Sequence, residues 1–260
     1  MLPIPIREIH IIKLLIYFKT ICALFLLLFS VVGFAGEYAD ENASNPLAKV
    51  KNTDLRWQYF DTGGGHINDV SVEGAFMAND NLKIKYELHY WETDLSGSSE
   101  QNLESTTLKA IYFPKDIQGD GRNYRVAAGI DWILDHGDAE KGIGSGSDQL
   151  APFLGLAIAY ESGLSVIPLV QHFSDYDGKT VNTTAFRAIV MMPLPEKSWL
   201  KLDAKVPVDW ENDNAIAATA ELQLGRTYSK GIGAYADLLV GLGSDRPYDW
   251  GLGAGIRFSY

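Results

Sequence analysis

The stretch GLGAGIRFSY, residues 251–260, decides the fold of this chain. Its apolar and aromatic side chains fall on every second position: Leu252, Ala254, Ile256, Phe258 and Tyr260. The positions between them are small or polar: Gly251, Gly253, Gly255, Arg257 and Ser259. Successive side chains of a β-strand point to opposite faces, so this pattern predicts a strand with one apolar face. A terminal aromatic residue beside its own carboxylate suits a water-soluble core poorly, so the rest of the chain must show what the apolar face contacts.

The same alternation recurs along the chain in segments that exceed the usual strand length of about five or six residues. Clear examples are LKIKYELHYWETD (82–94), YRVAAGIDWIL (124–134) and WLKLDAKVPVDW (199–210). Counting such segments predicts about twelve strands. They are expected near residues 53–62, 66–78, 82–94, 103–114, 124–134, 150–161, 164–174, 181–194, 199–210, 215–228, 232–242 and 250–260. The connectors alternate between mostly short and mostly long, acidic segments, and only KDIQGDGRN (115–123) is long where a short turn is due.

Strand length indicates which way the apolar faces point. About ten residues per strand match a tilted crossing of a bilayer, and an even strand count suits a closed barrel. Aromatic residues lie near the strand ends: Tyr90, Trp91, Tyr124, Trp132, Trp199, Trp210, Tyr248 and Trp250. These features predict an all-β fold, a transmembrane antiparallel up-and-down β-barrel of about twelve strands over residues 53–260, with a soluble periplasmic β-protein as the alternative. If the C-terminus is periplasmic, an even number of strands puts the start of the barrel and the short turns on the periplasmic side as well, and the long acidic loops outside.

The first 35 residues have the composition of an export signal. The apolar run TICALFLLLFSVVGFA (20–35) ends on small residues that suit a cleavage site, and basic residues precede it: Arg7, Lys13 and Lys19. We therefore expect a signal peptide over residues 1–35, cleaved on export to the outer membrane of a Gram-negative bacterium. A retained membrane anchor is the alternative. Residues 36–52 show no period and are expected to form a periplasmic N-terminal segment.

Composition excludes several classes of protein. With 33 acidic and 22 basic residues, a net charge of −11, the chain lacks the electrostatic attraction for phosphate on which nucleic-acid binding depends. The one cysteine, Cys22, lies in the predicted signal peptide, so the exported chain has no disulfide and no cysteine metal ligand. Acidic loops such as SDYDG (174–178) lack the ligand spacing of an EF-hand, so neither a metal nor a cofactor is expected.

Charged side chains occupy the face opposite the apolar one. They are Lys83, Lys85, Glu87, His89, Arg125, Asp131, Lys201, Asp203, Lys205, Glu221, Asp237 and Arg257. In a membrane barrel these residues are expected to point into the lumen. Two interpretations remain open at this point: a polar pore lining that selects solutes, or a lumen closed by its own salt bridges as in a plugged structural barrel.

One stretch, LVQHFSDYDGKTVNTTAF (169–186), has the residue types of a hydrolase site. His172 and Ser174 share a strand face, and the following turn is expected to bring Asn182 opposite His172 on that outward face. A serine nucleophile, a histidine base and an asparagine that orients the base are the parts of an acyl-transfer triad. A lipid-acting serine hydrolase is therefore an alternative function, although an enzyme is not the expected one.

The His172-x-Ser174 pair resembles that of outer-membrane phospholipase A, a twelve-stranded lipase. The resemblance implies a triad on the lipid-facing wall. Asp175 and Tyr176 follow the serine where that family has an Asn-Gly-Arg run associated with calcium binding. Lipid A deacylase barrels also use His-x-Ser but need a glutamate on the next strand, and none lies between Lys179 and Pro195.

The last hundred residues resemble a second group of barrels. IPLVQ (167–171), LGR (224–226) and DRPYDW (245–250) are similar to segments of Gram-negative outer-membrane barrels described as transporter-like, or as the MetA-pathway of phenol degradation family. The resemblance implies a passage for small, often hydrophobic molecules, and it carries over no binding residues. The strand ending at Tyr260 also looks like the signal read by the outer-membrane insertion machinery, so that machinery and outer-membrane lipids are the expected partners.

Overall fold

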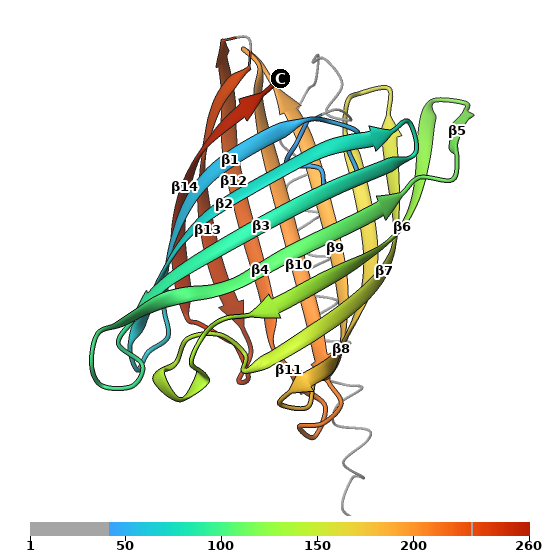
Figure 1. Ribbon diagram of the computed structural model, residues 1–260. Helices are drawn as coiled ribbons and strands as arrows, with labels where there is room; N and C mark the ends of the chain where they lie inside the picture. The colour runs from blue at the N-terminus through green and yellow to red at the C-terminus, as the bar shows by residue number, and fades with distance from the viewer. Residues whose placement is uncertain (1–41, 230) are drawn as a thin grey trace, which may run out of the picture.

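The computed structural model of the protein describes residues 42–229 and 231–260 (Figure 1). The predicted signal peptide, residues 1–35, lies outside the described residues. In the part of the chain that is described, no helix is long and apolar enough to cross a membrane. The structure is almost entirely β-sheet, with one short 3-10 helix, η2, at Ala139–Lys141.

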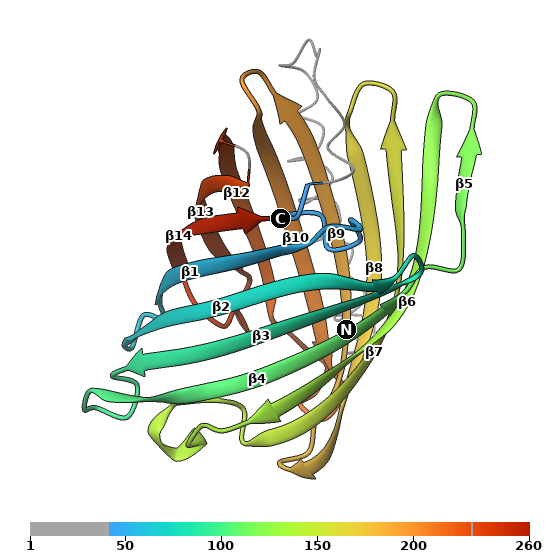
Figure 2. The ribbon, with the colours of Figure 1, turned by 45° about the horizontal axis from the view of Figure 1, so that its top comes forward.

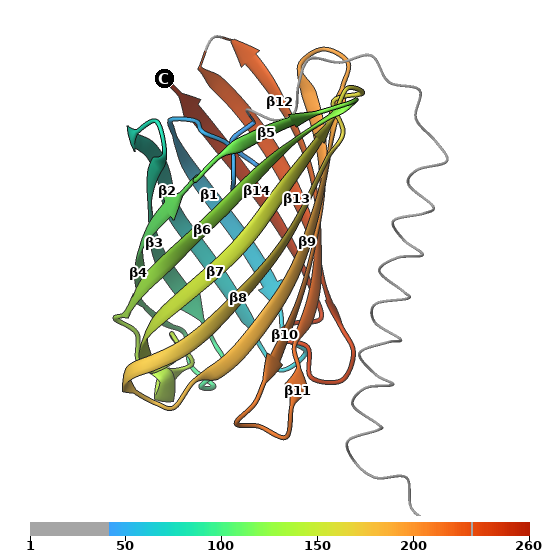
Figure 3. The ribbon, with the colours of Figure 1, turned by 90° about the vertical axis from the view of Figure 1, so that its right-hand side faces the viewer.

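Twelve long antiparallel strands close into a barrel, which confirms the predicted fold class (Figures 1 and 3). The strands are β1 Asn52–Asp61, β2 His66–Asn79, β3 Leu82–Thr93, β4 Glu100–Tyr112, β6 Arg122–Asp135, β7 Ser147–Tyr160, β8 Ser165–Gly178, β9 Asn182–Leu194, β10 Ser198–Asp209, β12 Ala218–Ser229, β13 Ile232–Leu242 and β14 Trp250–Ser259. Pairing of β1 with β14, from Asn52 opposite Ser259 to Asp61 opposite Trp250, closes the sheet on itself. Closure leaves no unpaired sheet edge, which is what a hydrocarbon environment requires.

The two ends of the barrel differ in their connectors. The turn end holds the C-terminus and short connectors such as residues 80–81 and 195–197. The loop end holds longer ones, including residues 94–99, 136–146 and 243–249. The alternation of connector lengths seen in the sequence thus follows from an up-and-down topology.

The connector KDIQGDGRN (115–123) is not one loop at the turn end. Its residues Asp116–Gly119 form strand β5, which pairs with the start of β6 around a tight turn in which Gly121 has φ 71° (Figure 2). All four β5 residues are exposed. This connector is longer than the other turns at this end because it contains a β-hairpin. A two-residue strand, β11 (Ala215–Ile216), similarly pairs with the end of β10.

The outer wall of the barrel is apolar. In β14, Leu252, Ile256 and Phe258 are 45%, 48% and 38% exposed, whereas Arg257 between the last two is only 8% exposed. Large exposed side chains of the same kind surround the barrel: Leu55, Trp57, Val70, Leu88, Leu108, Ile130, Leu154, Val170, Phe186, Leu222, Leu224, Leu238 and Val240. So wide an exposed apolar surface suits contact with hydrocarbon rather than water.

Inside the barrel, aromatic rings lie over glycines on the neighbouring strand. Each pair occupies directly opposite register positions: Tyr235 and Gly255, Trp199 and Gly225, Tyr86 and Gly74, Phe153 and Gly129. A Cβ atom added at any of these glycines would collide with the opposing ring. The glycines of β14 therefore make room for side chains from adjacent strands, an arrangement that also shields the bare glycine backbone.

We expect the substitution Gly255→Ala to lower the free energy of unfolding by about 1–3 kcal/mol, the usual cost of overpacking. The new methyl group would displace the Tyr235 ring, whose hydroxyl donates a hydrogen bond to the Asp54 carboxylate at 3.1 Å. Urea unfolding in detergent micelles measures the change. Gly64→Ala is the control, because nothing lies within 4 Å of its added Cβ. Equal stability of the two variants would contradict the close approach.

Candidate functional site: the barrel interior

Residues 42–48, which we call the strap, lie inside the barrel at its turn end (Figure 2). Asn45, Leu47 and Ala48 are fully buried. Local hydrogen bonds hold the strap as a compact turn: the Asn45 amide donates to the Asn42 carbonyl at 2.8 Å, and the Leu47 amide donates to the Asn45 side chain at 2.9 Å. The sequence predicted a periplasmic segment over residues 36–52. The part of it that forms the strap lies inside the barrel.

Lumen cations hold the polar side of the strap. Arg257 donates hydrogen bonds to Ser44 Oγ at 2.9 Å and to Asn42 Oδ1 at 3.2 Å. Lys83 is 1% exposed and donates to the Ala48 carbonyl at 2.6 Å. Two residues predicted to face the lumen therefore bind the protein's own chain. Lys83 also donates to the Pro46 carbonyl at 3.3 Å, so backbone carbonyls of the strap serve as acceptors for its buried ammonium group.

Arg125 and apolar packing hold the opposite side of the strap. Arg125 donates to the Leu47 carbonyl at 3.3 Å and to Asp116 of the β5 arm at 3.1 Å. Lys49 also pairs with Asp116, at 3.4 Å. Partial burial raises the pKa of Asp116, but the hydrogen bond and charge of Arg125 outweigh this effect and leave the pKa below its ordinary value. The Leu47 side chain packs in an apolar cluster that includes Phe113.

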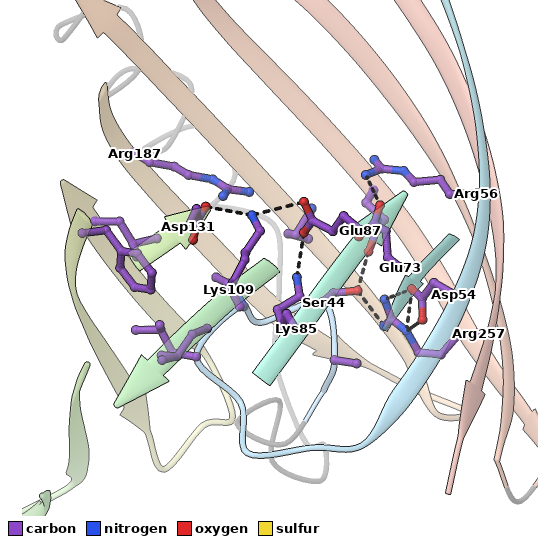
Figure 4. Close-up of a pocket in the computed structure, with 18 of the residues that line it drawn as sticks. Ser44, Asp54, Arg56, Glu73, Lys85, Glu87, Lys109, Asp131, Arg187 and Arg257 are labelled. Atoms are coloured by element: carbon purple, nitrogen blue, oxygen red, sulfur yellow. Dashed lines mark hydrogen bonds and ion pairs between the residues drawn. The ribbon is translucent and has the colours of Figure 1, made fainter. Parts of the chain in front are cut away.

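A central cavity of about 280 Å³ lies beneath the strap, with Ser44 and Leu47 in its lining (Figure 4). Its other walls come from strands all around the barrel. The ionisable lining residues are Asp54, Arg56, Glu73, Lys85, Glu87, His89, Lys109, Asp131, Arg187, Lys201, Tyr235 and Arg257. The cavity is therefore a polar space in a barrel whose outer wall is apolar.

A chain of alternating charges crosses one wall of this cavity. Lys85 and Lys109 each lie 3.2 Å from the Glu87 carboxylate, and Lys109 also lies 3.0 Å from Asp131 (Figure 4). Gln171 donates a further hydrogen bond to Asp131 at 2.9 Å. These groups come from strands β3, β4, β6 and β8, so the network ties neighbouring strands together through the lumen.

A second network surrounds Arg56 of β1. Its guanidinium lies within 4.0 Å of three carboxylates, those of Glu73, Glu221 and Asp237, of which Asp237 is nearest at 2.7 Å. Lys201 extends the network by pairing with Glu221 at 2.7 Å. These contacts link β1, β2, β10, β12 and β13 across the interior.

Predicted lumen residues also form further ion pairs, among them Lys201 with Asp203 at 3.5 Å. Asp203 accepts from Arg187 Nε at 2.8 Å. His89 lies 2.9 Å from Asp69. Arg257 forms a two-pronged contact with Asp54 at 2.6–3.0 Å.

Sequence reasoning missed several residues of these networks, which are Asp54, Arg56, Glu73, Lys109 and Arg187. The signal was present, because Arg56 lies between the apolar residues Leu55 and Trp57 in the first strand segment.

Lys205 differs from the other predicted lumen lysines. Among the described residues, no carboxylate lies within 4.0 Å of its ammonium group. The ammonium instead lies 5.1 Å from the centroid of the Phe173 ring. Phe173 lies between His172 and Ser174 in the sequence. Of these three residues, it is Phe173 that contacts the charged Lys205 side chain of the lumen.

A second cavity, of about 470 Å³, lies at the loop end of the interior. Inward residues of β9 and β10 line it, among them Thr183, Pro207 and Asp209, together with Asp245 and Arg246 of the connector between β13 and β14. The interior therefore contains hollow space at its middle and at its loop end.

The predicted arrangement of His172, Ser174 and Asn182 is wrong in its register. Asn182 pairs with Ser174, and Thr184 is the residue opposite His172. His172 Nδ1 shares a hydrogen bond of 3.0 Å with Thr184 Oγ1, while Asn182 donates to the exposed Glu211 carboxylate at 3.0 Å. The physical reason is that β8 continues as strand to Gly178, so the turn lies later than expected. Asn182 therefore does not orient His172.

Within residues 42–229 and 231–260, no three His, Cys, Asp or Glu side chains are grouped so that they could hold a metal ion. The acidic loops instead use their carboxylates locally. Asp135, for example, accepts hydrogen bonds from the Ser145 and Gly146 amides at 2.6 and 2.9 Å.

Solved structures share this architecture, although no protein-family model and no curated protein matches the sequence. The KdgM porin is similar with a TM-score of 0.59 and 11% identity over 80% of this chain and 99% of that one. The NanC porin gives 0.59 and 12% over 80% and 98%. The COG4313 outer membrane channel from Pseudomonas putida F1 gives 0.60 and 9% over 87% and 100%. The protein thus has the fold of outer-membrane β-barrel porins and channels, while the narrower likeness to the MetA-pathway group stays a prediction.

Proposed function

We propose that the protein is an outer-membrane channel for small polar solutes. The observation that carries this proposal is the charged central cavity, enclosed by a closed barrel whose outer wall exposes apolar side chains. The fold shared with porins and channels supports it. The charged lining favours polar solutes over the hydrophobic ones that the family resemblance implied.

In this proposal the chain is exported by its signal peptide and inserted through its last strand into the outer membrane of a Gram-negative bacterium. The turn end, with the C-terminus and the strap, faces the periplasm, and the loop end faces outward. A solute would enter at the loop-end cavity, move to the central cavity and leave past the strap. The strap is then the narrowest part of the route, because it fills the turn end with buried side chains.

We expect purified protein in planar lipid bilayers to give stepwise ion conductance, and proteoliposomes to swell in small sugars more quickly than in large ones. The same protein, unfolded by heat before reconstitution, is the control. Heat-modifiable migration on gels shows independently that the sample is folded. Folded protein that gives neither conductance nor swelling would contradict the channel and favour a plugged structural barrel.

A further inference from the structure

Two cations of the lumen lie directly opposite each other on neighbouring strands. Lys205 of β10 pairs in register with Arg187 of β9. Like charges at opposite positions destabilise a sheet. Lys85 and Lys109 form a similar pair, but both lie 3.2 Å from Glu87, which compensates their charge.

Among the described residues, no carboxylate lies within 4.0 Å of both Lys205 and Arg187. Asp203 accepts from Arg187 Nε and Nη2 but does not lie within 4.0 Å of Lys205. Lys109 is close enough for its positive charge to act on Lys205 as well. Asp203 and Asp131 both attract the ammonium, but only from beyond ion-pair distance. Three cations, Lys205, Arg187 and Lys109, thus face two carboxylates, Asp203 and Asp131. The local charge is positive, in a chain whose net charge is −11.

Lys205 and Arg187 lie on the inner wall of the barrel, in the region between the central cavity and the loop-end cavity. On the inward face of β10, Lys201 lines the central cavity, while Pro207 and Asp209 line the loop-end cavity. Lys205 lies between these positions on the same face. Arg187 lines the central cavity and its side chain is 38% exposed, so its Nη1 group is available to a molecule in the lumen.

We propose that Lys205 and Arg187 bind an anionic group of the solute, a carboxylate or a phosphate, as it moves from the loop-end cavity to the central cavity. This inference rests on the proposed channel function. An anion here supplies the missing counter-charge and accepts charge-assisted hydrogen bonds from both side chains. The aromatic ring of Phe173, 5.1 Å from the ammonium, holds Lys205 in place without neutralising it.

The test is calorimetric titration of the folded protein in detergent micelles, which needs no conductance. The probes are glutarate, inorganic phosphate and glutaramide, the neutral counterpart of glutarate. We expect at least one anion to bind and glutaramide not to bind, and the tighter anion identifies the preferred group. Lys205→Gln should weaken anion binding about tenfold, since a charged hydrogen-bond donor becomes neutral. Lys205→Arg should bind as the parent does.

The matched control is Lys179→Gln, which removes the same charge from the exposed connector between β8 and β9 and should leave binding unchanged. Equal binding of glutaramide, no binding of either anion, or unchanged binding in Lys205→Gln would each overturn the site. Bilayer conductance of the parent separates the two proposals. Conductance without anion binding rejects the site alone, whereas anion binding without conductance rejects the channel alone.

Discussion

Deletion of the strap, residues 42–48, is expected to raise the single-channel conductance several-fold. The strap fills the turn end of the lumen, and Asn45, Leu47 and Ala48 are fully buried there. It also supplies one wall of the central cavity. In the proposed channel, its removal widens the constriction at the turn end, and current through a water-filled pore rises with the cross-section of its constriction. Planar bilayer recordings of deletion and parent proteins measure the change.

A point variant keeps the chain length constant. Leu47→Asp places a carboxylate among apolar neighbours, where burial of an unpaired charge is costly, so the strap should leave its site and conductance should rise as in the deletion. Lys51→Asp, at an exposed position just beyond the strap, is the control. If the deletion and Leu47→Asp both conduct as the parent does, the strap does not limit the route.

Loss of the Arg257 guanidinium is expected to lower the free energy of unfolding by about 3–5 kcal/mol, the usual cost of removing one partner of a buried ion pair. Arg257 and Asp54 are 8% and 3% exposed and join the strands that close the barrel. Arg257→Met leaves the Asp54 carboxylate without its counter-charge. The variant also removes the hydrogen bonds from Arg257 to Ser44 and Asn42, so it loosens the strap.

Urea unfolding in detergent micelles, followed by tryptophan fluorescence, measures the loss. Arg246→Met is the control, because its pair with Asp249 is 41% and 38% exposed and should contribute less than about 1 kcal/mol. In the double variant Asp54→Leu with Arg257→Met, part of the stability should return, since no unpaired charge remains. Equal losses in Arg257→Met and Arg246→Met would show that the closing pair contributes little.

The alternating sequence by itself determined the wall of the barrel. A period of two is a local property, so it assigns each side chain of β14 to the outer or inner face without knowledge of any other strand. Strand lengths and connector lengths then determined the closed, up-and-down topology. The same local pattern showed that residues such as Lys201 and Asp203 share the inner face.

Only the tertiary structure decided which groups meet across the lumen. Register and strand tilt bring Arg56 of β1 to Glu221 of β12, and sequence spacing carries no information about that distance. Asn182 lies opposite Ser174 and not opposite His172, because β8 continues to Gly178, further than its composition suggested. The strap shows the same limit. Its residues have no period, and their place inside the barrel depends on donors from three distant strands, Arg257, Lys83 and Arg125, that are assembled only when the barrel closes.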